Sequence, residues 1–277
     1  MNISNEEFKK ISALIYDRFG ITLTDSKRNL VCGRLQKVIT LRGYKTFKEY
    51  LDYVETAKSP EALSELINKI STNHTFFFRE KAHFDFLSKT VFPELEKRQE
   101  HHDLRIWCAG CSSGEEAYSL VIQMMEYWGS KYIGLNAGVL ATDISEKVLD
   151  IAASAVYPEE KLKEIPLSTR HKYFRKKADG SWEVSQNVKE QVTLRRFNLM
   201  NEHFPFKKPF HIIFCRNVMI YFDTMIRKAL VNRFYDFTEN NGYFFIGHSE
   251  TLGRNDSPFE YITPAVYRKR DAKRGML

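Results

Sequence analysis

The chain has 277 residues, of which 43% are hydrophobic and 14% aromatic, enough for one large domain or two ordinary ones with buried cores. No run approaches the roughly 20 apolar residues of a membrane span, the acidic early residues do not resemble a signal peptide, and four cysteines are too few for a disulfide framework. We therefore expect a cytoplasmic protein that does not insert into membranes, and the net charge of +7 favours an anionic partner.

Residues 1–72 predict a small all-α domain. Apolar residues recur at helical spacing up to Gly20, and a second helix ends near Gly43. A third helix follows Thr46, whose hydroxyl is placed to cap it, and a fourth ends before residue 72. These short helices with short connections predict a bundle that precedes the rest of the fold.

Residues 73–277 predict an α/β domain. Beyond about residue 100, short apolar runs alternate with amphipathic helical stretches, which is typical of a doubly wound, mostly parallel sheet with helices on both faces. Helical periodicity lapses at about 172–196, where short polar runs around the turn at Asp179 and Gly180 predict a small antiparallel β insert. Residues 259–270 predict a closing pair of strands.

The segment IWCAGCSSGEEAYSL, residues 106–120, joins the first predicted strand of the sheet to its helix. Cys108 and Cys111 lack the further ligands that zinc requires, so we expect no metal site. They fall at the strand end and in the loop rather than at a helix N-terminus, which leaves a redox pair as a weaker alternative. The patterns of a hydrolase nucleophile elbow and of a P-loop are both absent from this segment.

The small residues of this turn favour a ligand-binding loop. In a doubly wound sheet, ligands bind at the carboxyl ends of the strands, and small residues let the backbone approach them closely. Glu115 and Glu116 at the start of the next helix disfavour a phosphate group there. The second strand ends at Asp143, which is placed either to hold ribose hydroxyls or to cap the following helix. These features favour a ligand that has a ribose and an amine but no phosphate, and S-adenosylmethionine is such a ligand.

Four stretches resemble the CheR-type chemotaxis receptor glutamate methyltransferases. They are ISTNHTFFFRE at 70–80, WCAGCSSGEEAYS at 107–119, LATDIS at 140–145 and FCRNVMIYFD at 214–223. Their order and spacing match the family over nearly the whole chain, as do the N-terminal helices and the β insert. The turn departs from the usual family form, since Ala117 stands where proline is common, and we expect its shape to survive because small residues stay small.

The resemblance implies a Rossmann-like class I methyltransferase fold and an enzyme that methylates glutamate side chains of chemoreceptors, with S-adenosylhomocysteine as by-product. The implied cofactor-binding residues are Asn73, Thr75, Arg79, Glu116, Asp143, Asn198, Leu199, Arg216 and Asn217. Arg79 and Tyr221 are implied to line the methyl-transfer site and to act in catalysis. Alternative roles are a helix cap for Asn73 and Thr75, a surface ion pair for Arg79, and a strand-end hydrogen bond for Tyr221.

The family's substrate is an acid-rich helical segment of the receptor's cytoplasmic coiled coil. Every charged residue from Lys27 to Lys48 is a cation, and we expect Arg28, Arg34 and Lys37 in this run to dock the substrate. The insert turn RKKADGSWEV lacks the longer glycine-containing loop of members that tether a receptor pentapeptide, so we expect no tethering. We expect the chain to be a monomer.

Three other functions stay open from the sequence. The basic charge permits an RNA methyltransferase, although we expect no nucleic-acid partner because no aromatic-rich basic RNA-binding motif is present. A module that senses the cofactor without catalysis is the second. A nicotinamide-dependent oxidoreductase is the third, and the absence of G-x-G-x-x-G after the first strand opposes it. His101 and His102 lie in a polar stretch and predict a loop rather than metal ligands.

Overall fold

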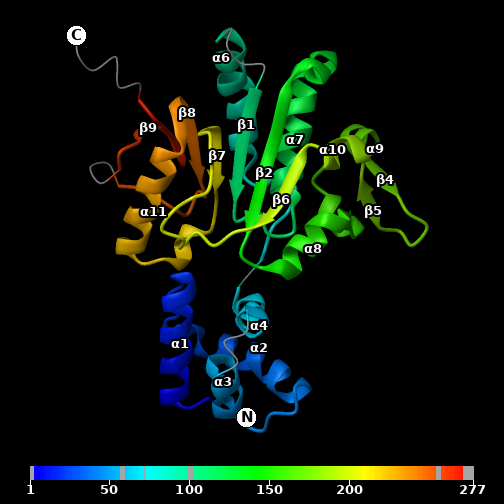
Figure 1. Cartoon of the computed structure of the whole chain (residues 1–277). Coiled ribbons are helices and arrows are strands. Elements are labelled where there is room, and N and C mark those ends of the chain that lie inside the picture. Colours follow the sequence, from blue (N-terminus) through cyan, green and yellow to red (C-terminus); the bar gives the residue numbers. More distant parts are fainter. Residues whose placement is uncertain (1–2, 57–59, 72, 99–102, 254–256, 271–277) are drawn as a thin grey trace.

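Helices fill the N-terminal part of the chain, as the apolar spacing predicts. The computed structural model describes residues 3–56, 60–71, 73–98, 103–253 and 257–270. The all-α domain consists of α1 (Asn5–Phe19), α2 (Arg28–Leu41), α3 (Phe47–Thr56) and α4 (Pro60–Ile70), drawn in blue and cyan in Figure 1. Their apolar faces enclose a common core, whose fully buried members include Ile11, Ile15, Leu35, Tyr50 and Leu66.

Local chemistry sets the ends of these helices. Ser4 and Glu7 form a reciprocal capping box at the start of α1, each side chain accepting from the other's backbone N–H. Gly20 ends α1 with φ of 69°, in the left-handed region that glycine adopts without strain. The Thr46 hydroxyl accepts a hydrogen bond from the Glu49 N–H, which confirms the predicted cap of α3.

The main sheet has the predicted doubly wound, mostly parallel arrangement, with strand order β6-β2-β1-β7-β8-β10-β9. Neighbours from β6 to β8 are parallel, whereas β10 is antiparallel to β8 and β9. The strands are β1 (Asp103–Ala109), β2 (Asn136–Asp143), β6 (Val192–Arg196), β7 (Phe210–Cys215), β8 (Thr238–Ile246), β9 (Glu260–Thr263) and β10 (Val266–Arg268). The strand order reverses beside β1. The carboxyl end of β1 is therefore the topological switch point, which is where doubly wound sheets bind ligands.

Helices cover both faces of this sheet. They are α5 (Lys81–Phe86), α6 (Phe92–Lys97), α7 (Glu115–Trp128), α8 (Glu146–Ser154) and α11 (Thr224–Asp236). Helices α5, α6 and α7 share a core with Ile106 and Phe214, while α11 shares another with the alternate residues Trp107 and Ile213. Strands buried on both faces read as continuous apolar runs, which is why β1 and β7 were recognisable. No helix within the described ranges is long and apolar enough to cross a bilayer.

The β insert exists, but its predicted bounds, 172–196, were wrong. The small antiparallel sheet contains β3 (Val156–Tyr157), β5 (Trp182–Val184) and β4 (Phe174–Lys176), flanked by α9 (Leu167–Tyr173) and α10 (Gln186–Lys189). Residues 192–196 instead form β6, which pairs in parallel with Val139–Asp143 of the main sheet. As an edge strand with a polar, partly exposed pattern, β6 was indistinguishable by sequence from the insert. The turn at Gly180 is present, with φ of 84°.

The two domains meet at the functional edge of the sheet. In Figure 1 the helical domain lies beyond the edge at which β1 and β2 end. Ile21, in the connection after α1, forms an isolated antiparallel bridge with Phe222. The N–H of the next residue, Thr22, donates to the carbonyl of Tyr221 at 2.9 Å. The helical domain is therefore hydrogen-bonded to the loop that follows β7.

Candidate active site

A cavity lies between the helical domain and the carboxyl ends of the parallel strands. The connection from α1 to α2 contributes Ile21, Leu23 and Lys27 to its wall, and the turn after β1 contributes Gly110 and Ser112. The residues predicted for the cofactor and for methyl transfer all line it: Asn73, Thr75, Arg79, Glu116, Asp143, Asn198, Leu199, Arg216, Asn217 and Tyr221. The fold thus brings together side chains that are far apart in the sequence.

The turn after β1 is tied to the end of β2. The N–H groups of Gly110 and Cys111 both donate to the carbonyl of Thr142, at 2.8 and 2.9 Å. Gly110 has φ of 85°, and a Cβ on it would lie 2.4 Å from the Val218 side chain. A glycine is therefore required here both for backbone conformation and for close approach of the neighbouring loop.

Asp143 organises the same turn. One carboxylate oxygen accepts from the Ser112 N–H and the other from the Ser145 N–H, both at 2.9 Å. Burial raises the pKa of Asp143 above its ordinary value, against the opposing effect of these donors. The N-cap of α8 is Ser145, whose hydroxyl accepts from Val148 N–H, so the alternative of Asp143 as the helix cap was wrong. Asp143 instead joins the two loops that line the cavity.

The two cysteines of the turn are buried thiols. Cys108 donates its S–H to Glu116 Oε1 at 3.1 Å, and Cys111 is 1% exposed. Burial raises the pKa of both thiols well above the usual range, because it disfavours the thiolate, and nearby carboxylates add to this. A redox-active pair needs an accessible, stabilised thiolate, so this environment opposes the redox alternative.

The adjacent glutamates that begin α7 have separate roles. The Glu115 side chain is fully buried, accepts from the Ser113 hydroxyl at 2.7 Å and pairs with Lys161 at 3.0 Å, away from the cavity lining. Glu116 lines the cavity and pairs with Arg216 at 2.8 Å. Of these two glutamates, only Glu116 presents its carboxylate to the cavity.

Arg216 is the central cation of the site. Its side chain is 1% exposed and pairs with Glu116 at 2.8 Å and Glu80 at 3.1 Å. The same guanidinium donates to the backbone carbonyl of Arg79. Arg216 thus joins the end of β7 to the first turn of α7 and to the segment before α5, three elements that border the cavity.

Arg79 and Tyr221 both line the cavity. The Arg79 guanidinium donates to the His74 carbonyl at 3.0 Å, while its nearest carboxylate, on Glu80, lies 4.0 Å away. The Tyr221 ring has the Lys27 ammonium 4.9 Å from its centroid. Lys27, which sequence reasoning placed in the basic run only, therefore belongs to the cavity as well.

Other predicted residues are fixed by local hydrogen bonds. The Asn73 amide donates to the Ser71 hydroxyl at 3.3 Å, and the Asn198 amide donates to the Arg18 carbonyl at 2.9 Å. Leu199 is buried in the core cluster under α11. Because α5 begins only at Lys81, Asn73 does not cap it, and the same holds for Thr75.

Sequence reasoning missed Glu250, which supports the loop after β7. Its carboxylate accepts from the N–H groups of Asn217 at 2.8 Å, Ile220 at 3.1 Å and Gly247 at 2.6 Å. Asn217 has φ of 60°, a conformation that costs free energy and persists where neighbouring contacts hold it. In the sequence, Glu250 is one acid in the stretch GHSE, and no pattern indicates its role. The role follows only from the fold, which places Glu250 next to the loop after β7.

The predicted docking residues lie on α2, outside the cavity lining. Arg28 pairs with Asp25 at 3.1 Å. Arg34 donates to backbone carbonyls at the end of α4, including that of Ile70 at 2.9 Å. Lys37 is exposed. The structure therefore gives Arg28 and Arg34 partners within the domain.

The chemistry of the cavity fits S-adenosylmethionine. Asp143 lines the cavity at the end of β2, the position where such sheets commonly have an acid for ribose hydroxyls, and the Glu116 carboxylate lines the same cavity. The first turn of α7 is acidic, which disfavours a phosphate there. The doubly wound sheet and this cavity define an S-adenosylmethionine-dependent methyltransferase with a Rossmann-like fold.

Comparison with known proteins identifies the family. Residues 73–267 match the CheR methyltransferase SAM binding domain, and residues 6–71 match the CheR methyltransferase all-alpha domain. A chemotaxis protein methyltransferase of Borreliella burgdorferi is 42% identical over 97% of this chain and 96% of its own length. Chemotaxis protein methyltransferase 2 of Vibrio cholerae is 34% identical over 93% and 89%, and the Escherichia coli chemotaxis protein methyltransferase is 33% identical over 96% and 91%. The chain belongs to the CheR methyltransferase family.

Proposed function

We propose that the chain methylates glutamate side chains of chemoreceptors during chemotaxis, forming glutamate methyl esters. The observation that supports this most directly is that Arg79 and Tyr221 line the same cavity as the predicted cofactor residues. Relatives that cover nearly the whole chain are named chemotaxis protein methyltransferases. The resemblance assigns Arg79 and Tyr221 to the methyl-transfer site.

The chemistry of this reaction suits a site without a general base. A glutamate side chain has an ordinary pKa of about 4.3, so its carboxylate is already ionised at neutral pH. The cofactor supplies an electrophilic methyl group when bound. Arg79 and Tyr221 orient the carboxylate, while the walls of the cavity exclude water. Arg79 must not bind the carboxylate too tightly, because neutralising its charge would weaken the nucleophile.

The proposed substrate is an acid-rich helix of the receptor's cytoplasmic coiled coil, which the chain meets as a cytoplasmic monomer. The basic surface of α2 provides the complementary charge, with Lys37 as its exposed member. Arg28 and Arg34 contribute positive potential while they keep their partners in the domain.

Lys37→Ala is expected to raise the KM for a receptor fragment several-fold. It is expected to leave S-adenosylhomocysteine affinity unchanged, because Lys37 lies outside the cavity lining.

Arg34→Ala, on the same helix, is the variant to compare with Lys37→Ala. It is expected to lower the free energy of unfolding by about 1.5–3 kcal/mol, since the carbonyls at the end of α4 lose a charged donor. Steady-state kinetics, calorimetry and urea unfolding measure these effects. A loss of cofactor affinity in Lys37→Ala would contradict the docking role.

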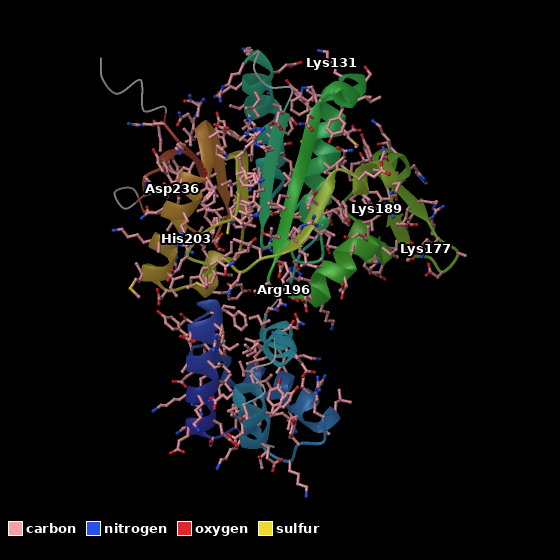
Figure 2. The ribbon with its side chains drawn as sticks, in the orientation of Figure 1. Lys131, Lys177, Lys189, Arg196, His203 and Asp236 are labelled. Carbon is pink, nitrogen blue, oxygen red and sulfur yellow. The ribbon has the colours of Figure 1, made fainter. Side chains whose placement is uncertain are left out.

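We further propose that the chain does not tether a receptor's C-terminal pentapeptide. The hairpin between β4 and β5 is short, and Lys177 lies at its outer turn in Figure 2. The expected result is no binding of such a peptide to the purified protein by calorimetry, and equal methylation of receptor fragments with and without the pentapeptide. Measurable peptide binding would overturn this part of the proposal.

The central test combines calorimetric titration with S-adenosylhomocysteine and a transfer assay with radiolabelled S-adenosylmethionine on receptor cytoplasmic fragments. We expect tight cofactor binding and alkali-labile label in the receptor, because a methyl ester hydrolyses in alkali and an N-methyl group does not. Cofactor binding with alkali-stable label would indicate a different acceptor. Label in RNA, together with RNA binding that weakens steeply with salt, would favour an RNA methyltransferase.

A further inference from the structure

Three potential metal ligands from separate segments meet beside the Arg216 network. Glu80 precedes α5, His83 lies within α5, and His248 follows β8. His83 Nδ1 lies 3.5 Å from Glu80 Oε2, and His248 Nε2 lies 3.9 Å from the same oxygen. One donor atom of each residue lies within 4.8 Å of the other two. We call these residues the Glu80–His83–His248 cluster.

His83 is the unusual member of this cluster. It is 1% exposed, and neither ring nitrogen has a hydrogen-bond partner in the part of the chain that the structure describes. A buried polar group without a partner costs free energy, and such groups in native proteins call for an explanation. A neutral imidazole binds a metal ion through a ring nitrogen, so the two unpartnered nitrogens of His83 offer a ligand atom.

We propose that Glu80, His83 and His248 bind one divalent transition-metal ion, with Zn²⁺ as the expected type. Two imidazoles and one carboxylate are a donor set that zinc uses, with a fourth position left for water. Tetrahedral zinc with bonds of about 2.0–2.1 Å separates its ligand atoms by about 3.4 Å. The distance of 3.5 Å between Glu80 and His83 already satisfies this. The His248 side chain is 46% exposed and has room to close the remaining distance.

The proposed ion and Arg216 both interact with Glu80. Metal binding is therefore expected to affect the cavity that Arg216 lines. Glu80 Oε2 lies 3.1 Å from an Arg216 nitrogen, so an ion on this oxygen competes with the guanidinium. The positive charge of Arg216 opposes a dication and makes the affinity lower than that of a structural zinc site. Because Arg216 also pairs with Glu116 in the cavity lining, the ion is expected to weaken cofactor binding. By linkage, the cofactor weakens metal binding by the same factor.

The inference is tested on the full chain without an affinity tag, by Co²⁺ titration followed by visible absorption and by Zn²⁺ competition with a chromophoric chelator. Cys32, which the structure leaves partly exposed, is replaced by serine in every protein so that its thiol does not bind the ion. We expect one ion per chain and a Co²⁺ spectrum with the visible bands of a site of low coordination number. His248→Ala is expected to weaken binding at least about tenfold, because it removes one of three protein ligands.

Two variants separate a metal site from a packing role. His203→Ala removes another exposed histidine, labelled in Figure 2, and is expected to bind metal as the parent protein does. His83→Phe keeps an aromatic ring beside Phe214 and Phe245, and is expected to retain or gain thermal stability while losing the ion. Absence of a Co²⁺ spectrum, or equal affinity in the parent and His248→Ala proteins, would overturn the site.

The coupling is measured by calorimetric titration with S-adenosylhomocysteine, with and without saturating Zn²⁺. We expect cofactor affinity to fall several-fold with Zn²⁺ in the parent protein and to stay unchanged in His248→Ala. Unchanged cofactor affinity in a parent protein that binds the ion would overturn the coupling. The inference rests on cofactor binding and not on the glutamate substrate, so its failure is distinguishable from failure of the proposed function.

Discussion

Replacing Arg79 with alanine is expected to lower methyl-transfer turnover on receptor fragments by about a hundredfold or more. Misplacing reacting groups by about 1 Å can lower a rate by about 10², so a residue that orients the carboxylate can have an effect of this size. The Arg79 guanidinium lines the cavity and is held by the His74 carbonyl, so it is oriented before substrate arrives. Single-turnover rates at saturating cofactor measure the effect without interference from product release.

The matched variant is Arg79→Lys, which keeps the charge and loses the planar fork of donors. We expect its turnover to lie between those of the parent protein and of Arg79→Ala. The backbone carbonyl of Arg79, which accepts from Arg216, stays in place in both variants, so thermal stability should change little. Near-normal turnover in Arg79→Ala would remove Arg79 from the proposed mechanism.

Replacing Arg216 with methionine is expected to lower the free energy of unfolding by about 3–5 kcal/mol, because it leaves two largely buried carboxylates without their cation. The side chains of Glu80 and Glu116 are only 13% and 14% exposed, so water compensates poorly for the loss. S-adenosylhomocysteine affinity should fall as well, since Arg216 fixes Glu116 in the cavity lining. Urea unfolding and calorimetry measure the two effects.

A double variant separates charge from packing in this prediction. Arg216→Met with Glu116→Gln removes one of the stranded charges and is expected to recover part of the lost stability. Lys208→Met is the control, because its pair with Asp103 lies on the surface with the Lys208 side chain 70% exposed, and it should cost less than about 1 kcal/mol. If Arg216→Met were as stable as the Lys208 control, the central role given to Arg216 would be wrong.

Most of the fold was predictable because its signals are local. The helices of the first domain follow from apolar residues one turn apart and from caps such as Ser4 and Thr46. The parallel sheet follows from apolar runs that alternate with amphipathic helices. The bounds of the β insert failed because β6 is a partly exposed edge strand, whose partner β2 is fixed by pairing across the fold.

The motif residues that line the candidate site could be predicted from the sequence, but the contacts that each of them makes could not. The motif residues do meet in one cavity, yet the adjacent Glu115 and Glu116 diverge, since neighbouring positions at the start of a helix point in different directions. Arg34 stabilises the end of α4, a contact that no pattern on α2 reveals. Lys27 enters the cavity wall only because the helical domain is hydrogen-bonded to the loop after β7.

The sequence by itself determined the helical domain, the doubly wound sheet and the glycine turn that borders the cavity, since periodicity, caps and small residues act within a few positions of one another. Only the tertiary structure decided where β6 pairs, which carboxylates Arg216 joins, how Glu250 holds the loop of Asn217, and that Glu80 and His83 meet His248. Those contacts connect residues far apart in the chain. The charged and polar groups interact strongly only once the packed fold has removed them from water and placed them next to one another.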